Sequence, residues 1–471
     1  MEKTLNTVSI KDDTQSDEVG QILIDEKKLT RKVDYRVLSI MFITYSLQFM
    51  DKLALSAGSV FGIKKDLGLK RQDYSWSSSV FYFGYLLGNF IVTRLLQVLP
   101  IGKFVSVSVC LWAICLAVSA SCFNYSSLIA ARFFLGLLES SISPAFVLLT
   151  SMWWKQSQQP ARSGVWFAGN DFGGIVSSFV AFGLGHINGK IASWRYIFIV
   201  YGCATFLWSF VMFAFLPDSP QTARFLTSEE KQYYAEHLPQ SKVESKWDWE
   251  QAKSCVFDIN LLLLLMCTVL CILPNSGVIS YGFIIVDNFG FTPIQTTLLQ
   301  LPGSVISWMA ITSTGLLGTR FKNARCILIA AVCVVSIVGG CLIYRGSSRG
   351  VKLLGYYFVS VQPAVFPIVL SMVASNFRGS TRRSIVSNAI FIVYCACNIG
   401  GPQLFRYQDA PEYSPAFESW IICYCLNIAI VVVIALKYRW DNKKQESKDQ
   451  ETLPTTLDAP EYTDPKFRYM Y

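Results

Sequence analysis

An arginine and a glutamate stand inside one long apolar stretch of this sequence. Arg132 and Glu139 are seven positions apart, about two helical turns, so their side chains fall on one side of a helix roughly 10 Å apart. A charged side chain near the centre of a bilayer costs roughly 3 kcal/mol, and such residues face the interior of a bundle or a water-filled path. The pair therefore predicts a polar cavity inside a membrane protein.

Further ionisable side chains lie in other apolar stretches. Asp51 and Lys52 belong to the first stretch, and Asp171 belongs to the fifth. An arginine can hold an anionic group through two hydrogen bonds, and a buried carboxyl group can take up and release a proton. We predict that Arg132 binds the substrate. We predict proton-coupling roles for Glu139, Asp171 and Asp51, and a gating role for Lys52 beside Asp51.

Several amide side chains accompany these charges and are predicted to shape a substrate pocket. They are Gln48, Asn170, Asn275, Gln300 and Gln362. Amides inside a bundle also bond neighbouring helices, at well under roughly 2 kcal/mol each, so each has a purely structural alternative. The charged groups have structural alternatives too. These are an ion pair between Arg132 and Glu139, a helix-end pair of Asp51 with Lys52, and a structural partner for Asp171.

The elements that position these residues are helices that cross a membrane. The chain has 471 residues, of which 52% are hydrophobic and 15% charged, and its mean hydropathy is +0.39. Soluble domains carry about 25% charged residues, and a spanning helix needs about 20 mostly apolar residues. We predict an all-α polytopic membrane protein with twelve spans, at residues 37–57, 75–96, 103–122, 127–149, 163–185, 195–216, 259–284, 293–316, 324–344, 350–373, 384–405 and 415–437.

The spans divide into two six-helix bundles around one long polar loop. We expect a disordered N-terminal tail (1–35), a first bundle (36–216), a central loop (217–258), a second bundle (259–437) and a disordered C-terminal tail (438–471). A short amphipathic helix should start in the central loop at Thr227 or Ser228. Basic residues flank the first and last spans, so both tails and the central loop are predicted to be cytoplasmic.

Composition also excludes other classes of function. Only two histidines occur, and neither lies in a metal-binding or nucleophile motif, so we expect no metal site, no cofactor and no enzymatic activity. The net charge of +9 forms no basic stripe with interleaved aromatics, so no nucleic-acid binding is expected. Most of the fourteen cysteines lie in apolar segments, where cysteine is normally a small buried hydrophobe.

Motifs in a fixed order give the chain a family resemblance. It resembles the fungal allantoate-permease-type anion:cation symporters of the major facilitator superfamily over about residues 36–440. The motifs are Gln48-Phe-Met-Asp51-Lys52 with Gly62-Ile-Lys-Lys-Asp66-Leu, Arg132-Phe-x-Leu-Gly136-x-x-Glu139-x-x-x-x-Pro144, Leu216-Pro-Asp-Ser-Pro220-x-x-Ala223-Arg-Phe-Leu226, Ser375-Asn-x-x-Gly379-x-x-Arg382-Arg383-Ser, and Asn398-Ile-Gly-Gly-Pro402-x-Leu-Phe405 with Asp409-Ala-Pro411-x-Tyr413.

The resemblance implies a carrier that works by alternating access, with two bundles rocking about a site near the midplane. It implies proton-coupled import of a small organic anion or a vitamin, nitrogen or sulfur nutrient, such as allantoate, nicotinate or pantothenate. We expect a monomer in the plasma membrane, with the endoplasmic reticulum or vacuolar membrane as alternatives. A non-transporting nutrient sensor and an uncoupled uniporter are the alternative functions on the same fold.

Overall fold

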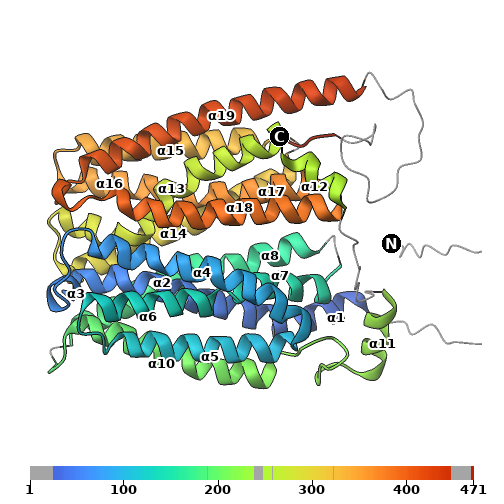
Figure 1. The fold of residues 1–471 in the computed structure, drawn as a ribbon, viewed down its shortest axis with the longest axis horizontal. Helices are drawn as coiled ribbons and strands as arrows, with labels where there is room; N and C mark the ends of the chain where they lie inside the picture. The colour runs from blue at the N-terminus through green and yellow to red at the C-terminus, as the bar shows by residue number, and fades with distance from the viewer. Residues whose placement is uncertain are drawn as a thin grey trace, which may run out of the picture.

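The protein is described by a computed structural model that covers residues 25–155, 158–187, 189–237, 248–256, 258–321, 323–446 and 468–471. Within these ranges the regular structure is helical and contains no strand. The long helices run side by side in two groups, one from each half of the chain (Figure 1). The first half forms the lower group in that view and the second half forms the upper group.

Six spans make up the first bundle. They are α2 (Ser39–Val60), α4 (Asp73–Val98), α5 (Ile101–Ser119), α6 with α7 (Tyr125–Glu139 and Ile142–Trp153), α8 with α9 (Gln159–Phe167 and Gly169–Gly185), and α10 (Ser193–Phe215). Two shorter elements, α1 (Glu26–Val33) and the π-helical turn η1 (Asp34–Leu38), precede them, and α3 (Ile63–Asp66) follows α2.

Six spans also make up the second bundle, which confirms the predicted twelve-span fold. They are α13 (Ile259–Asn288), α14 (Pro293–Arg320), α15 (Arg325–Arg345), α16 with α17 (Arg349–Val359 and Val365–Asn376), α18 (Ser380–Gly400) and α19 (Ser414–Glu446). The 3-10 turns η2 (Gln362–Ala364), η3 (Gly401–Leu404) and η4 (Tyr407–Asp409) connect parts of this bundle.

The spans differ in how apolar they are. Nine helical segments among the described residues are long and apolar enough to cross a membrane on length and composition alone. The other three predicted spans correspond to α2, α8 with α9, and α14. Each of these carries polar side chains, such as Lys52 in α2, Asp171 in α9 and Gln300 in α14. The least apolar spans are therefore those expected to face a cavity rather than lipid.

Two spans at equivalent places in the two halves are broken near their middle. The fourth span is interrupted between Glu139 and Ile142, and the tenth between Val359 and Val365. A proline lies just after the first break (Pro144) and within the second (Pro363), and proline supplies no amide hydrogen to a helix. Interrupted helices in corresponding positions of two repeats are a pointer to the binding site of a carrier.

The contacts between the bundles also follow this repeat. The fifth span packs on the eighth (α9 on α14), and the second packs on the eleventh (α4 on α18). If spans one to six are exchanged with spans seven to twelve, the fifth and eighth spans become the eleventh and second. The first and seventh spans (α2 and α13) pack on each other. The two halves are therefore arranged as repeats about a shared interface.

Parts of the two tails that we expect to be disordered have defined structure. Residues 26–33 form α1, and α19 continues to Glu446. Residues 468–471 pack against the second bundle. The prediction of disorder is wrong for these parts, because helix extension and backbone hydrogen bonds order them without apolar periodicity. The rest of both predicted tails, residues 1–24 and 447–467, lies outside the described residues.

The central loop contains two helices. The predicted amphipathic helix is α11 (Ser228–His237), and its cap is Thr227, whose hydroxyl accepts a hydrogen bond from the Glu230 amide at 3.2 Å. A second helix, α12 (Trp249–Val256), was not expected. In Figure 1 α1, α11 and α12 lie at one end of the bundles. We call this the inner end, because the basic flanks predict that it is cytoplasmic, and the opposite end, near α3, the outer end.

Glycines allow the closest helix crossing in the first bundle. A Cβ atom on Gly136 of α6 would lie 1.9 Å from the Phe81 backbone oxygen of α4. One on Gly84 of α4 would lie 2.1 Å from the Phe133 oxygen of α6. Both distances are far below van der Waals contact, so only glycine permits this crossing. The crossing fixes α6, which carries Arg132 and Glu139.

We expect Gly136→Ala to destabilise the first bundle, because backbone atoms of α4 must move to admit the methyl group. The cost should be about 2 kcal/mol or more, seen as a lower melting temperature and less monodisperse protein on size-exclusion chromatography. Gly315→Ala in α14 is the matched control, since a Cβ there meets nothing within 4 Å. Equal melting temperatures for the two variants would contradict this account of the crossing.

Candidate functional site

A cavity of about 390 Å³ lies between the two bundles. Its wall combines the first bundle (α2, α4, α7, α8 and α9) with the second (α13, α14, α16, α17 and α18). Residues beside both helix breaks, Ser143 and Ser360, reach it. A volume in this range suits a small organic molecule, and a wall shared by two rigid bundles can change as they move.

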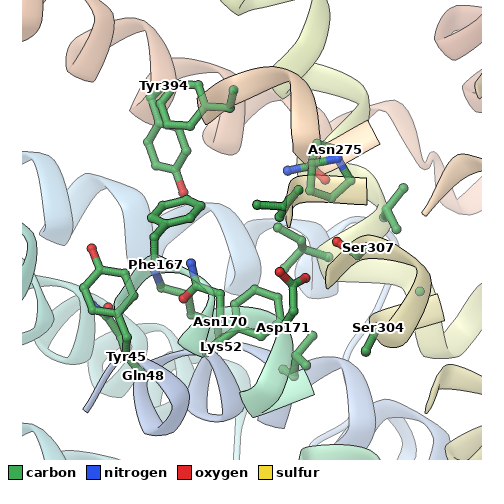
Figure 2. A pocket seen from close by; sticks show the side chains of 18 of the residues that line it. Tyr45, Gln48, Lys52, Phe167, Asn170, Asp171, Asn275, Ser304, Ser307 and Tyr394 are labelled. Atoms are coloured by element: carbon green, nitrogen blue, oxygen red, sulfur yellow. The ribbon is translucent and has the colours of Figure 1, made fainter. Parts of the chain in front are cut away.

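The structure places some of the predicted site residues at this cavity and others behind it. The residues that line it are Gln48, Lys52, Asn170, Asp171, Asn275 and Gln300. The residues absent from its lining are Asp51, Arg132, Glu139 and Gln362. Figure 2 shows Lys52, Asn170 and Asp171 from the first bundle and Asn275 and Ser307 from the second around a common space. The polar groups of both halves therefore converge.

Lys52 is the basic side chain that reaches the cavity. Its Nζ atom lies 6.0 Å from the ring centroid of Phe81 and 5.6 Å from that of Tyr85. No ion pair to Lys52 occurs among the described residues. An aromatic face attracts an ammonium group but does not neutralise it. The cavity therefore offers a cation to an incoming anion.

Arg132 and Glu139 are buried inside the first bundle, and the structure shows no ion pair between them. The Arg132 Nε atom donates to the Ser77 backbone oxygen at 3.3 Å, and its guanidinium carbon lies 5.0 Å from the Phe81 ring centroid. None of the described residues donates a hydrogen bond to the carboxylate oxygens of Glu139. Its backbone oxygen accepts one from Gln48 Nε2 at 3.3 Å, which links it to the cavity wall.

Asp51 points away from the cavity although it neighbours Lys52. Its carboxylate accepts a hydrogen bond from Trp112 Nε1 at 2.6 Å and one from the Thr205 hydroxyl at 3.5 Å. Neighbouring residues on a helix are about 100° apart around its axis. One of the pair therefore faces the cavity while the other faces α5 and α10, and the predicted helix-end pair at the membrane surface is not what the structure shows.

The five predicted amide residues differ in whether their side chains are hydrogen-bonded to other residues. Gln300 donates to the Gly282 oxygen at 2.9 Å and accepts from the Tyr356 hydroxyl at 2.6 Å. Gln362 donates to the Cys271 oxygen away from the cavity. No hydrogen bond from another described residue engages the side chains of Asn170 or Asn275. These two amides keep their donors and acceptors available at the cavity wall.

Tyrosines form a part of the site that the sequence prediction missed. Tyr45, Tyr82, Tyr85 and Tyr394 line the cavity beside Lys52. The Ser143 hydroxyl joins two of them, at 2.8 Å from the Tyr45 hydroxyl and 3.1 Å from that of Tyr85. The spacing of Tyr82 and Tyr85, which puts them on one helix face, is the signal in the sequence. The wall can therefore stack against a planar group as well as bind a charge.

The bundles are joined at the outer end by hydrogen bonds between neutral groups. The Tyr74 hydroxyl donates to the Ser280 oxygen at 2.7 Å, and the Ser78 and Ser280 hydroxyls are 2.7 Å apart. Other links pair Ser75 with Tyr281, Ser79 with Ile399 and Gln403, and Gln72 with Tyr407. We call this set the outer seal. Among the described residues no hydrogen bond or ion pair joins the bundles at the inner end, so the links between the bundles are concentrated at the outer end.

A lysine covers the outer seal. Lys64 of α3 lies with its Nζ atom 4.5 Å from the Tyr74 ring centroid and 5.8 Å from that of Tyr281. Burial lowers the pKa of Lys64 to about 8, an effect that Asp287 partly opposes. Since Tyr74 and Tyr281 belong to different bundles, this cation also contacts both halves.

Comparison with known proteins identifies the family. Residues 40–402 match the model of the Major Facilitator Superfamily. The chain belongs to this superfamily. The allantoate permease of Saccharomyces cerevisiae is 29% identical over 476 residues, which cover 94% of this chain and 86% of the permease. An uncharacterized transporter of Schizosaccharomyces pombe, C757.13, is 32% identical, with 95% of this chain and 88% of the relative covered.

Solved structures share the fold of this major facilitator protein. A D-xylose-proton symporter matches with a TM-score of 0.67 and 13% identity, covering 85% of this chain and 97% of the symporter. A bacterial homologue of the lysosomal transporter Spinster matches with a TM-score of 0.61 and 12% identity, covering 86% and 96%. The predicted resemblance is confirmed. The protein is a multi-pass membrane transporter for small molecules, and it is not an enzyme.

We expect a cysteine pair at Ser78 and Ser280 to lock the transporter by an oxidative cross-link. Their hydroxyl oxygens are 2.7 Å apart across the two bundles, which is close enough for a disulfide after small adjustments. Oxidation of the double variant should abolish transport, and a reductant should restore it, because the outer seal must open in each cycle. The single variants Ser78→Cys and Ser280→Cys are the controls. Full transport by the cross-linked protein would rule out opening at this seal.

Proposed function

We propose that this transporter imports a small organic anion together with protons by alternating access. The observation that carries the proposal is Lys52, a cation in a largely apolar cavity that makes no direct ion pair with a described residue, although the Glu139 carboxylate attracts it from behind the wall. A charge removed from water is costly unless it is paired. A substrate carboxylate would supply that partner, and the transmembrane potential contributes about 2.3 kcal/mol per charge at 100 mV.

The neighbouring groups support a substrate with a planar or polar body. Asn170 and Asn275 present free amides from opposite bundles, and the tyrosines beside Lys52 present ring faces. The names of similar proteins fit such chemistry, since allantoate permease and a thiamine pathway transporter of Saccharomyces cerevisiae are among them. We propose the nutrient class of ureides, vitamins and sulfur-containing acids, taken up at the plasma membrane by a single chain.

The roles of the charged residues follow from where they lie. Lys52 binds the substrate anion, a role that we predict for Arg132 from the sequence, and Arg132 holds α4 through the Ser77 oxygen. Asp171 at the cavity and Glu139 behind it are the proton sites. Gln48 connects Glu139 to the cavity, since it lines the cavity and bonds the Glu139 backbone. Asp51, held by Trp112, couples proton state to the position of α2.

We expect Lys52→Gln to weaken substrate binding strongly. Removing one member of a buried charge pair costs about 2 kcal/mol or more, which is at least about 30-fold in affinity. Uptake of radiolabelled allantoate, with unlabelled nicotinate, pantothenate and cysteine as competitors, measures the effect at matched surface abundance. Lys52→Arg is the matched control, since it keeps the charge. Equal KM values for Lys52→Gln and the wild type would contradict anion binding at this residue.

We expect Glu139→Gln to separate substrate movement from proton movement. The neutral amide cannot release a proton, so accumulation against a gradient should be lost while counterflow exchange persists. Asp171→Asn tests the second site in the same way. A protonophore should abolish wild-type accumulation. A Glu139→Gln variant that still accumulates substrate in a protonophore-sensitive way would remove Glu139 from the coupling role.

The same measurements decide between the alternative functions. A nutrient sensor on this fold would bind the probe without moving it into proteoliposomes. A uniporter would equilibrate the probe but would not respond to the protonophore. The cation at the cavity fits an anionic ligand in each of these functions, so these two measurements are what separate them.

A further inference from the structure

Residues 468–471 occupy a site at the inner end of the second bundle, outside the transport cavity. Two asparagines each bind both backbone groups of one residue in this segment. Asn376, at the end of α17, donates to the Met470 oxygen and accepts from the Met470 amide, both at 2.8 Å. Asn442 of α19 does the same with Tyr469, at 2.9 Å and 2.7 Å.

This pairing requires an extended segment between two helices. In an extended chain the N–H and C=O groups of one residue point to one side, and those of the next residue point to the other. Met470 therefore pairs with α17 on one side while Tyr469 pairs with α19 on the other. The asparagines recognise the backbone, so these bonds would hold almost any extended sequence.

Aromatic contacts add selectivity at one position. The Tyr469 ring stacks on the Tyr438 ring of α19, with centroids 4.9 Å apart and planes 16° apart. Only 6% of Tyr469 is exposed. The Tyr471 oxygen accepts a hydrogen bond from the Arg325 amide at 3.3 Å, whereas the Met470 side chain is half exposed. The site therefore selects an aromatic residue where Tyr469 stands.

The helix held by this segment is one that lines the cavity. α17 begins just after the break in the tenth span, and its residues Phe366 and Leu370 reach the cavity wall. Its last residue, Asn376, belongs to the motif at 375–384, for which substrate binding gives no role. The docked segment ties this end of α17 to α15 through Arg325 and to α19 through Asn442.

We propose that the inner ends of α15, α17 and α19 form a docking site for an extended peptide that carries an aromatic residue. The chain's own residues 468–471 fill this site and hold the end of α17 against α15 and α19. We call this docked segment the latch. Residues 447–467 connect the segment to α19, and such a connection gives an effective concentration in the millimolar range. A modest intrinsic affinity is then enough to keep the segment docked, and a small change is enough to release it.

A proline at position 470 tests the latch in the full-length protein. Met470→Pro removes the amide that donates to Asn376, while the extended conformation that proline favours at the preceding residue suits the site. Met470→Ala is the matched control, since it keeps the amide and changes only a half-exposed side chain. The lost hydrogen bond should lower docking about tenfold.

The first readout is binding of a fluorescent synthetic peptide with the sequence of residues 465–471. We expect a dissociation constant on the order of 100 μM with the Met470→Pro protein. Binding should be several-fold weaker to the wild type and Met470→Ala, whose sites are filled. A peptide with alanine in place of Tyr469 should also bind at least tenfold more weakly. No binding at 1 mM, or equal binding to all three proteins, would overturn the proposal.

The second readout is hydrogen exchange along the chain, which needs no substrate. Met470→Pro should raise exchange in residues 365–376 and leave α7 in the first bundle unchanged, and added peptide should restore protection. Met470→Ala should match the wild type. Increased exchange in both α17 and α7 that the peptide does not reverse would indicate general destabilisation and would overturn the latch.

Discussion

The whole arrangement depends on the cost of exposing a charge or an unpaired polar group to lipid. Most of the buried charges of the first bundle are therefore either bonded inside it or turned to the cavity. Arg132 meets the Ser77 backbone oxygen, and Asp51 meets Trp112. Lys52 has no such ionic partner among the described residues and lies at the cavity, against two aromatic rings. The same cost explains why the three least apolar spans, α2, α8 with α9, and α14, contribute to the cavity wall.

Helix breaks give this cavity its polar surface without exposing backbone to lipid. An interrupted helix leaves carbonyl and amide groups that must find partners, and inside a bundle those partners are side chains. Gln48 donates to the Glu139 oxygen at the break of the fourth span. Near the break of the tenth span, Gln362 donates to the Cys271 oxygen. The two breaks occupy equivalent places in the repeats, but a side chain of α2 bonds the first, whereas the second supplies a side chain, Gln362, that bonds α13.

The sequence alone predicts the spans, the two halves, the central helix with its Thr227 cap and the charged and amide residues at the cavity. Apolar length and capping chemistry are local properties, which explains this success. It does not predict that Lys52 rather than Arg132 meets the cavity, because helical spacing says which residues share a face but not what that face packs against. It also misses the docked residues 468–471, since backbone hydrogen bonds leave no pattern of side chains.

The positions of the hydrogen bonds between the two bundles favour a low barrier to rocking of one bundle against the other. At the inner end a separate part of the central loop bonds to each bundle. The Tyr234 hydroxyl of α11 donates to the Trp153 oxygen in the first bundle, and Asp258, just after α12, pairs with Arg382 in the second at 2.5 Å. The bonds that cross between bundles belong to the outer seal and join neutral groups, each worth about 1 kcal/mol. When the seal opens, water can replace hydrogen bonds between uncharged groups, whereas breaking a buried ion pair would leave two unpaired charges. The barrier to opening is therefore one that substrate binding can offset.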